Sequence, residues 1–272
     1  MFGGRSRPEA WKDAPGVRLE LENRGDYAAV LKMLEPGAVI HAACWSRAAD
    51  CEQDPQRARS VNVAAVAEWL EASSSFDSFP VYVSTEQVFR GTEALYREEF
   101  TPDASTVYGA TKAEAEALVL AAGGAVVRLP LLLGPRIDQG RVGADQAMYE
   151  ALIAGQTPRL FHDEIRTPVV ATAIARPLWR IARRRLPGIF HLAGADAVSR
   201  LGLGQAVAAF HGLEPRFEST SAHDFEGPRR SLKLVLGTER AQKELGWTPP
   251  NLRQSLAWND APPVVREVGE SS

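Results

Sequence analysis

The sequence predicts an α/β fold: a doubly wound, mostly parallel sheet with a smaller C-terminal subdomain. Between residues 17 and 134, short apolar segments alternate with helical segments, which is the order that builds βαβ units. Beyond residue 134 this alternation gives way to short helices and polar loops, so we expect a second packing unit there.

Composition limits the classes of function. At 272 residues the chain can bury a sizeable core, and a net charge of −3 without a long basic run argues against a nucleic-acid-binding surface. No apolar run approaches the ~20 residues of a membrane span. The two cysteines, Cys44 and Cys51, fit a reduced cytoplasmic protein. The histidines form no close metal-ligand pair, so no metal site is predicted.

The strands are predicted from apolar runs. Residues 17–22 alternate apolar and polar side chains, as a half-buried strand does. Residues 38–43 and 80–83 are continuous apolar runs typical of buried strands, and the first of them ends in small residues that would let a flat ligand approach the backbone. Two further buried strands are expected at residues 125–130 and 188–194.

The helices are predicted from composition and from their end signals. Residues 111–122 contain neither Pro nor Gly, and Gly123-Gly124 stop this helix. Pro36-Gly37 close a short amphipathic helix at residues 27–34. Thr238 is expected to cap a last helix that Gly246 ends. The other helices are expected at residues 57–72, 144–154, the later part of 169–184, and 201–211.

Two segments place reactive side chains at one edge of the predicted sheet. Thr85 follows the strand at residues 80–83 and should lie at its carboxyl end, where open α/β sheets bind ligands. Tyr108 opens a helix, and Lys112 lies one turn further along the same helical face. The three side chains can therefore act on one small volume.

This arrangement suits the reduction of a carbonyl group. A phenol has an ordinary pKa of about 10, and an ammonium held nearby favours the phenolate and brings that pKa toward the working range. Thr85 would supply a neutral hydroxyl that polarises the carbonyl oxygen. The alternative is a surface tyrosine and a surface lysine paired by chance, but their place after a strand and at the start of a helix favours catalysis.

Several segments carry a family resemblance in the right order along nearly the whole chain. They are Ser84-Thr85-Glu86-Gln87-Val88-Phe89, Tyr108 with Lys112, His41-Ala42-Ala43 with Glu52, Pro55 and Asn62 downstream, Asp163-Glu164-Ile165-Arg166-Thr167-Pro168, and Leu245-Gly246-Trp247-x-Pro249. This set resembles the extended short-chain dehydrogenase/reductase family, and within it the reductases similar to dTDP-4-dehydrorhamnose reductase. The resemblance implies a Rossmann-like sheet.

The resemblance also implies a reaction, the NAD(P)H-dependent reduction of a nucleotide-linked 4-keto-6-deoxy sugar. A hydride passes from the nicotinamide to the sugar carbon, and Tyr108 protonates the new alkoxide. Lys112 would lower the Tyr108 pKa and hydrogen-bond the nicotinamide ribose. Thr85 would hold the carbonyl oxygen.

Two residues are the implied substrate contacts, Gln87 and Arg166. The family often has Tyr at the position of Gln87, so this departure leaves the substrate's identity open. Arg166 is a candidate for the nucleotide diphosphate, because a guanidinium matches phosphate oxygens in a bidentate fork. The alternative is a surface arginine paired with Asp163 or Glu164.

Cofactor contacts are implied by position. The implied set is Arg5, Ser6, Arg7, Glu20, Leu21, Ala42, Ala43, Lys112, Leu129 and Pro130. Within it, the two alanines would admit the diphosphate, Glu20-Leu21 would border the adenine, and Leu129-Pro130 would flank the nicotinamide. The two N-terminal arginines fall where the family contacts the adenosine ribose. They suit a 2′-phosphate, so NADP(H) is predicted over NAD(H).

The N-terminal segment departs from the family pattern. Family members begin with a strand, a Gly-x-x-Gly-x-x-Gly turn and a helix that binds the cofactor diphosphate, whereas residues 2–7 here resemble the end of the second strand. The sheet is therefore expected to lack its first strand and to expose two unpaired edges. We expect the true start to lie upstream of Met1; the alternative is a truncated relative that does not hold the cofactor normally.

The resemblance divides the chain into two parts and a tail. Residues 1–134 and 168–196 would form the dinucleotide-binding domain, residues 135–167 and 197–258 the substrate-binding subdomain, and residues 259–272 a loose tail. The implied partner is a nucleotide-sugar substrate, with neither nucleic acid nor membrane. A homodimer is one arrangement that the sequence leaves open.

Two other functions stay open at this point. An epimerase or dehydratase of the same fold would hold its cofactor without net turnover, so steady consumption of NADPH separates it from a reductase. A noncatalytic regulatory subunit is the third candidate, because one methionine adenosyltransferase partner subunit belongs to the resembled family. Capture of a partner protein without cofactor binding would support it.

Overall fold

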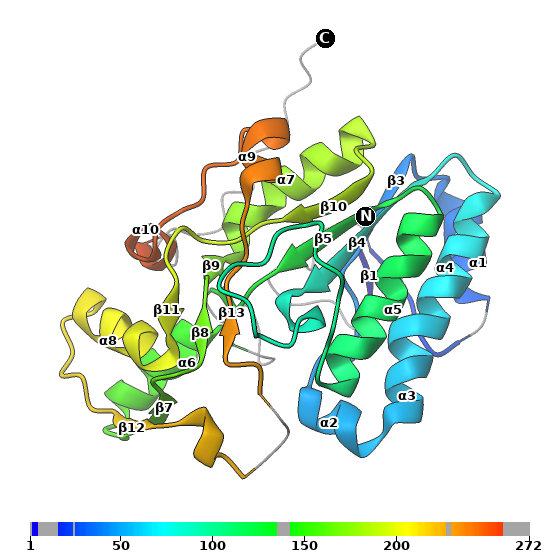
Figure 1. The fold of residues 1–272 in the computed structure, drawn as a ribbon. Coiled ribbons are helices and arrows are strands. Elements are labelled where there is room, and N and C mark those ends of the chain that lie inside the picture. Colours follow the sequence, from blue (N-terminus) through cyan, green and yellow to red (C-terminus); the bar gives the residue numbers. More distant parts are fainter. Residues whose placement is uncertain (1, 5–15, 24, 135–141, 227–229, 258–272) are drawn as a thin grey trace.

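A central parallel sheet confirms the predicted α/β class. The computed structural model describes residues 2–4, 16–23, 25–134, 142–226 and 230–257. Four parallel strands lie in the order β10-β5-β4-β3 (Figure 1). They are β3 (Ala38–His41), β4 (Phe79–Thr85), β5 (Ala125–Leu129) and β10 (Gly188–His191). The carboxyl ends of β3, β4 and β5 therefore lie next to one another.

Two N-terminal strands form a separate parallel pair, β1 (Phe2–Gly4) and β2 (Gly16–Arg18). Among the described residues, β3 pairs with β4 on one side and with no strand on the other. The break falls where the predicted sheet lacks its first strand. The strand expected at residues 17–22 is shorter than predicted, because a turn begins at Glu20, whose carbonyl accepts a hydrogen bond from the Asn23 amide.

Helices cover both faces of the sheet. On one face α1 (Asp26–Leu34), α4 (Ala65–Ser74) and α5 (Val107–Ala121) lie side by side, and α7 (Ala171–Arg184) packs on β3 and β4 from the other face (Figure 1). The helix expected at residues 57–72 is present and longer than predicted, because the chain is helical without a break from residue 55 to residue 74. It consists of α3 (Pro55–Arg59), a π-helical turn at Ser60–Ala64, and α4, and it follows the short α2 (Ala48–Gln53).

Helix α5 begins at Val107, one residue before the tyrosine that was predicted to open it, and its first turn is capped twice. The Thr106 side chain accepts a hydrogen bond from the Gly109 amide at 3.1 Å, and Glu52 accepts one from the Val107 amide at 2.8 Å. Tyr108 is therefore held inside the first turn of the helix, and its orientation is fixed by the cap.

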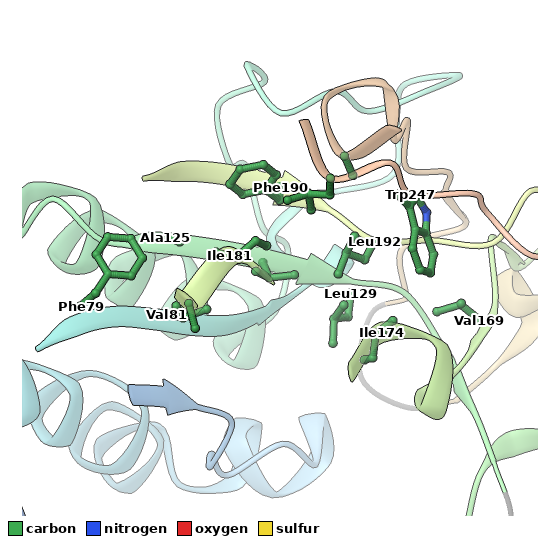
Figure 2. Packing of buried hydrophobic residues seen from close by; sticks show 14 residues of the cluster. Phe79, Val81, Ala125, Leu129, Val169, Ile174, Ile181, Phe190, Leu192 and Trp247 are labelled. Carbon is green, nitrogen blue, oxygen red and sulfur yellow. The ribbon is translucent and has the colours of Figure 1, made fainter. Parts of the chain in front are cut away.

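Apolar side chains on alternate strand positions form two main cores. One lies between the sheet and α7, where Val81, Leu129 and Ile181 pack together with Trp247 (Figure 2). The other lies between the sheet and helices α1, α4 and α5, around the fully buried Trp69. Burial of these side chains holds the helices against the sheet.

The remaining elements follow the central strands in short pieces. They are β6 (Leu132–Leu133), α6 (Ala144–Ile153), β7 (Arg159–Phe161), β8 (Ile165–Arg166), β9 (Val169–Val170), β11 (Val198–Ser199), α8 (Arg200–Phe210), β12 (Glu218–Thr220), β13 (Lys233–Leu234), α9 (Glu239–Leu245) and α10 (Leu252–Ala257), with 3-10 turns at Glu86–Val88 and Ala222–Asp224. Helices α6, α8 and α10 share one apolar cluster that contains Met148, Val207 and Leu256.

Two expectations about α9 need correction. The Thr238 side chain makes no capping hydrogen bond in the described structure, and α10 follows, so α9 is not the last helix. Gly246 does end α9 in a left-handed conformation, as predicted. Ala241 and Leu245 of α9 pack in the core under the central sheet. The division into subdomains at residues 135–167 and 197–258 stays a prediction.

No helix among the described residues combines the length and the apolar character needed to cross a membrane.

A close approach between α5 and the turn after β4 depends on Gly109. A Cβ atom at this position would overlap the carbonyl oxygen of Gln87 and press on the Cβ of Ala104. Neither atom can move aside by a side-chain rotation, because the Gln87 oxygen belongs to the backbone and the Ala104 side chain is a single methyl group. Glycine at position 109 therefore lets the first turn of α5 lie directly against the turn that carries Thr85.

We predict that Gly109→Ala destabilises the protein by about 1–3 kcal/mol, although alanine normally stabilises a helix more than glycine does. The physical reason is the overlap with Gln87, which separates α5 from β4. Urea unfolding monitored by circular dichroism measures the change. Gly37→Ala is the matched control, because no atom lies near its added Cβ and its backbone is not left-handed. Equal stability of the two variants would contradict the prediction.

Candidate active site

The carboxyl end of β4 and the first turns of α5 bring three predicted residues together. Thr85 ends β4, and Tyr108 and Lys112 lie one helical turn apart on α5. The Thr85 hydroxyl lies close enough to Tyr108 to act on the pKa of its phenol. The exposed fractions are 8% for Thr85, 7% for Tyr108 and 1% for Lys112, so the site is dry and its electrostatic effects are strong.

Lys112 is an ammonium held under the sheet surface. Its Nζ donates a hydrogen bond to the Val83 carbonyl oxygen at 2.8 Å and lies 3.9 Å from the centre of the Tyr82 ring. Burial lowers the pKa of Lys112 to about 8, and the charges of Cys44 and Glu116 oppose that fall. Lys112 therefore exchanges its proton near neutral pH.

Tyr108 has a pKa well above its ordinary value. Burial is the largest cause of this rise in pKa, and interactions with Cys44 raise the pKa further. Only the interaction with the Thr85 hydroxyl lowers it. The expected fall of this pKa under the influence of Lys112 is wrong for this structure, because burial dominates and the contacts of Lys112 are with Val83 and Tyr82.

Cys44 is a neighbour of Tyr108 that the sequence analysis missed. It packs with Tyr108, Cys51 and Trp45 in one small cluster. The segment that carries it is fixed by Asn62, whose side chain accepts a hydrogen bond from the Trp45 amide at 2.8 Å and donates one to the Trp45 carbonyl at 3.1 Å. Asn62 lies in the π-helical turn, a feature often found at functional sites.

The turn after Thr85 positions Gln87 close to the site. The Gln87 amide donates a hydrogen bond to the Thr85 hydroxyl oxygen at 3.2 Å, and the residue is half-buried. Its backbone carbonyl faces Gly109 at the start of α5. Whether its side chain meets a substrate stays a prediction.

The predicted cofactor contacts lie in three places. Ala42 and Ala43 are exposed just after β3, and Leu129 and Pro130 are buried at the end of β5, where Leu129 pairs with Thr85. These two pairs of residues thus lie at the carboxyl ends of β3 and β5, the two strands that flank β4. Glu20 and Leu21 follow β2, with Leu21 packed against the core under α1 and α4. The predicted ribose contacts Arg5, Ser6 and Arg7 lie outside the described residues.

These residues fit the reacting end of a nicotinamide dinucleotide. The two alanines are exposed after β3, and Leu129 and Pro130 lie at the end of β5 next to Thr85 at the carboxyl end of β4. Ligands of open α/β sheets bind at this edge. Among the described residues, no group of three or more His, Cys, Asp or Glu side chains is arranged to hold a metal ion.

Arg166, predicted to bind the substrate diphosphate, is buried and bound to the protein. Its Nε lies 3.0 Å from a Glu86 carboxylate oxygen, and one terminal nitrogen lies 3.5 Å from Glu164. The terminal nitrogens also donate to three backbone carbonyls, those of Ile165, Ser231 and Leu232. The guanidinium therefore joins β8 to the turn after β4, and a diphosphate would have to displace one of these contacts.

Glu86 is the partner that the sequence analysis did not single out. It is 4% exposed, and burial raises its pKa to about 8 against the opposing charge of Arg166. Two further arginines face Glu164, with Arg230 at 2.7 Å and Arg200 at 3.9 Å. Three guanidiniums, those of Arg166, Arg200 and Arg230, thus share the carboxyl groups of Glu86 and Glu164.

A second buried pair, Glu116 and Arg128, was also missed. Its nitrogen and oxygen atoms approach to 2.7 Å, and both side chains are almost fully buried. The signal in the sequence was a lone arginine within the apolar run at residues 125–130, since a buried charge requires a partner. Glu116 is four residues after Lys112 and so on the same helical face.

Proteins of similar sequence include a methionine adenosyltransferase subunit and a glycan biosynthesis reductase. Methionine adenosyltransferase 2 subunit beta of Xenopus tropicalis is 29% identical over 202 residues, which is 70% of this chain and 60% of that protein, so the match spans less than two thirds of the relative. The probable low-salt glycan biosynthesis reductase Agl14 of Haloferax volcanii is 27% identical over 263 residues, or 94% of this chain and 88% of that protein.

Solved structures share the fold. A dTDP-4-dehydrorhamnose reductase from Bacillus anthracis in complex with NADP has a TM-score of 0.82 at 18% identity, covering 90% of this chain and 88% of that one. A UDP-glucose 4-epimerase from Thermotoga maritima with UDP-glucose has a TM-score of 0.80 at 18% identity, covering 91% and 84%. At these identities the likeness establishes the fold alone.

The model of the RmlD substrate binding domain family matches residues 9–259, well over half of the chain. With the parallel sheet and the Tyr108, Lys112 and Thr85 arrangement, this match confirms the resemblance identified in the sequence. The chain belongs to the RmlD substrate binding domain family, within the extended short-chain dehydrogenase/reductases.

Proposed function

We propose that this protein is an NAD(P)H-dependent reductase of a nucleotide-linked 4-keto-6-deoxy sugar. The observation that carries the proposal is the placement of Thr85 at the carboxyl end of β4 beside the turn of α5 that carries Tyr108 and Lys112. Membership of the RmlD substrate binding domain family and the relative named as a glycan biosynthesis reductase support it.

The bound nicotinamide would supply a hydride to the sugar carbon. Thr85 would donate its hydroxyl hydrogen to the carbonyl oxygen, and Tyr108 would give its proton to the same oxygen as negative charge develops there. A raised phenol pKa keeps Tyr108 protonated until that moment. Lys112, charged below a pH of about 8, would favour the phenolate that remains.

Two further functions have specific support. The relative named methionine adenosyltransferase 2 subunit beta favours a regulatory subunit, and the fold shared with a UDP-glucose 4-epimerase keeps an epimerase open. Steady consumption of NADPH with a nucleotide-linked 4-keto sugar distinguishes the reductase from both. A homodimer, a cytoplasmic location and the identity of the sugar stay predictions.

Tyr108→Phe is expected to lower kcat about 10²- to 10⁴-fold, because it removes the proton donor while keeping the ring. KM should change little, since the ring still fills its pocket. The measurement is NADPH oxidation followed by absorbance with a nucleotide-linked 4-keto sugar. Tyr149→Phe is the control, because Tyr149 lies on α6 against His211 and away from this site. Unchanged kcat in Tyr108→Phe would contradict the assignment.

NADPH is expected to bind about tenfold more tightly than NADH, since a charge-assisted hydrogen bond to the 2′-phosphate is worth about 1.5–3 kcal/mol. Fluorescence titration of the 272-residue chain, and of any form extended upstream in frame, measures this preference. The double variant Arg5→Ala and Arg7→Ala should lose the preference while NADH affinity stays constant, which is an internal control. Tighter binding of NADH would refute it.

Arg166→Lys is expected to lower the melting temperature by several degrees, because a lysine cannot reproduce the contacts with Glu86 and three carbonyls. The KM for the sugar nucleotide should rise less than about threefold. Arg159→Lys is the control, as Arg159 is an exposed arginine paired with Glu218. A much larger rise in KM at an unchanged melting temperature would instead support direct contact of Arg166 with the diphosphate.

A further inference from the structure

A row of polar side chains crosses three strands under α5. Ser84, Arg128 and His191 are register neighbours on β4, β5 and β10, and all three are buried. Glu116 on α5 lies against this row. Its carboxylate accepts a hydrogen bond from the Ser84 hydroxyl at 2.5 Å and from Arg128 Nη2 at 2.7 Å and Nε at 3.1 Å.

His191 contributes hydrogen bonds to this row and no charge. Burial and the nearby Arg128 lower its pKa to about 3, so its ring is neutral. In that form Nε2 accepts from Arg128 at 3.4 Å, while Nδ1 donates to the Gly237 carbonyl at 3.0 Å. Arg128 also lies 4.9 Å from the centre of the Phe89 ring. Glu116 is thus the carboxylate that balances Arg128.

Glu116 also lies one helical turn beyond Lys112. Lys112 is almost completely removed from water, so its charge depends on nearby groups. The charged or titratable groups around it are Glu116 and Tyr108 on α5, Tyr82 on β4, His41 on β3 and Cys44 after β3. His41 has its pKa lowered to about 3 by burial and carries no charge to oppose the ammonium.

We propose that Glu116, held by Arg128 and Ser84, is a positioning residue whose negative charge keeps Lys112 protonated in the reductase site. The same carboxylate binds the hydroxyl of Ser84, the residue before Thr85, so it also fixes α5 against the strand end that carries Thr85. The catalytic meaning of the proposal rests on the proposed function. The charge of Lys112 itself is measurable without any substrate.

Nitrogen-15 NMR of the lysine side chains tests the proposal directly. The signal of Lys112 is assigned with Lys112→Met, and its titration is compared between the native protein and Glu116→Gln, which has nearly the same shape without the charge. In Glu116→Gln the midpoint of Lys112, about 8 in the native protein, is expected to fall by roughly half to one pH unit. An unchanged midpoint overturns the proposal.

Two variants separate charge from shape. Glu114→Gln makes the same chemical change two residues earlier, where Glu114 pairs with the exposed Arg59, and should leave the Lys112 midpoint unchanged. Glu116→Asp keeps the charge on a shorter side chain. If the charge matters, Glu116→Asp should have a Lys112 midpoint close to the native one. If only the shape matters, the isosteric Glu116→Gln should have the midpoint closer to the native one.

The pH profile of kcat gives a second readout. In Glu116→Gln the alkaline limb should move down in pH by the same amount as the Lys112 midpoint. If the protein shows no reductase activity, the proposed function fails while the NMR titration still decides the charge proposal. If Glu116→Gln does not fold, the double variant Glu116→Gln and Arg128→Met removes the same carboxylate without leaving an unpaired buried guanidinium. It should still lower the Lys112 midpoint, and an unchanged midpoint there also overturns the proposal.

Discussion

The packing of α5 against β4 is the constraint on which the site depends. Tyr108 and Lys112 are on the helix and Thr85 is on the strand, so their separation is set by how closely these two elements approach. Gly109 permits contact with the Gln87 carbonyl at one end of the interface. Glu116, bound to Ser84 and Arg128, fixes it one turn beyond Lys112. A short strand end and one helical turn therefore act as a single rigid unit.

Burial shifts the pKa values of the side chains in this unit, and it also requires that buried charges nearby be paired. Removal from water raises the pKa of Tyr108 and lowers that of Lys112, which moves the proton affinities of the two groups apart. The buried charges near these residues need partners, and the structure provides them in two ion-pair groups. Glu116 with Arg128 lies under α5, and Glu86 with Arg166 joins the turn after Thr85 to β8.

The Glu86 and Arg166 pair also links the two sides of the candidate site. Arg166 lies in the segment predicted to bind substrate, whereas Glu86 directly follows Thr85. The buried contact therefore ties β8 to the turn that follows Thr85. The unusual pKa of Glu86, about 8, makes the charge of this link dependent on pH near neutrality.

The sequence by itself determined the α/β class, the order of strands and helices, and the candidate set of Thr85, Tyr108 and Lys112, because these follow from local periodicity and fixed helical spacing. Tertiary structure decided the rest. The π-helical turn around Asn62, the contact of Cys44 with Tyr108, and the burial of Arg166 all depend on residues distant in sequence. The direction of the Tyr108 pKa was reversed for the same reason: burial, the largest cause, is a property of the folded packing and not of spacing along the chain.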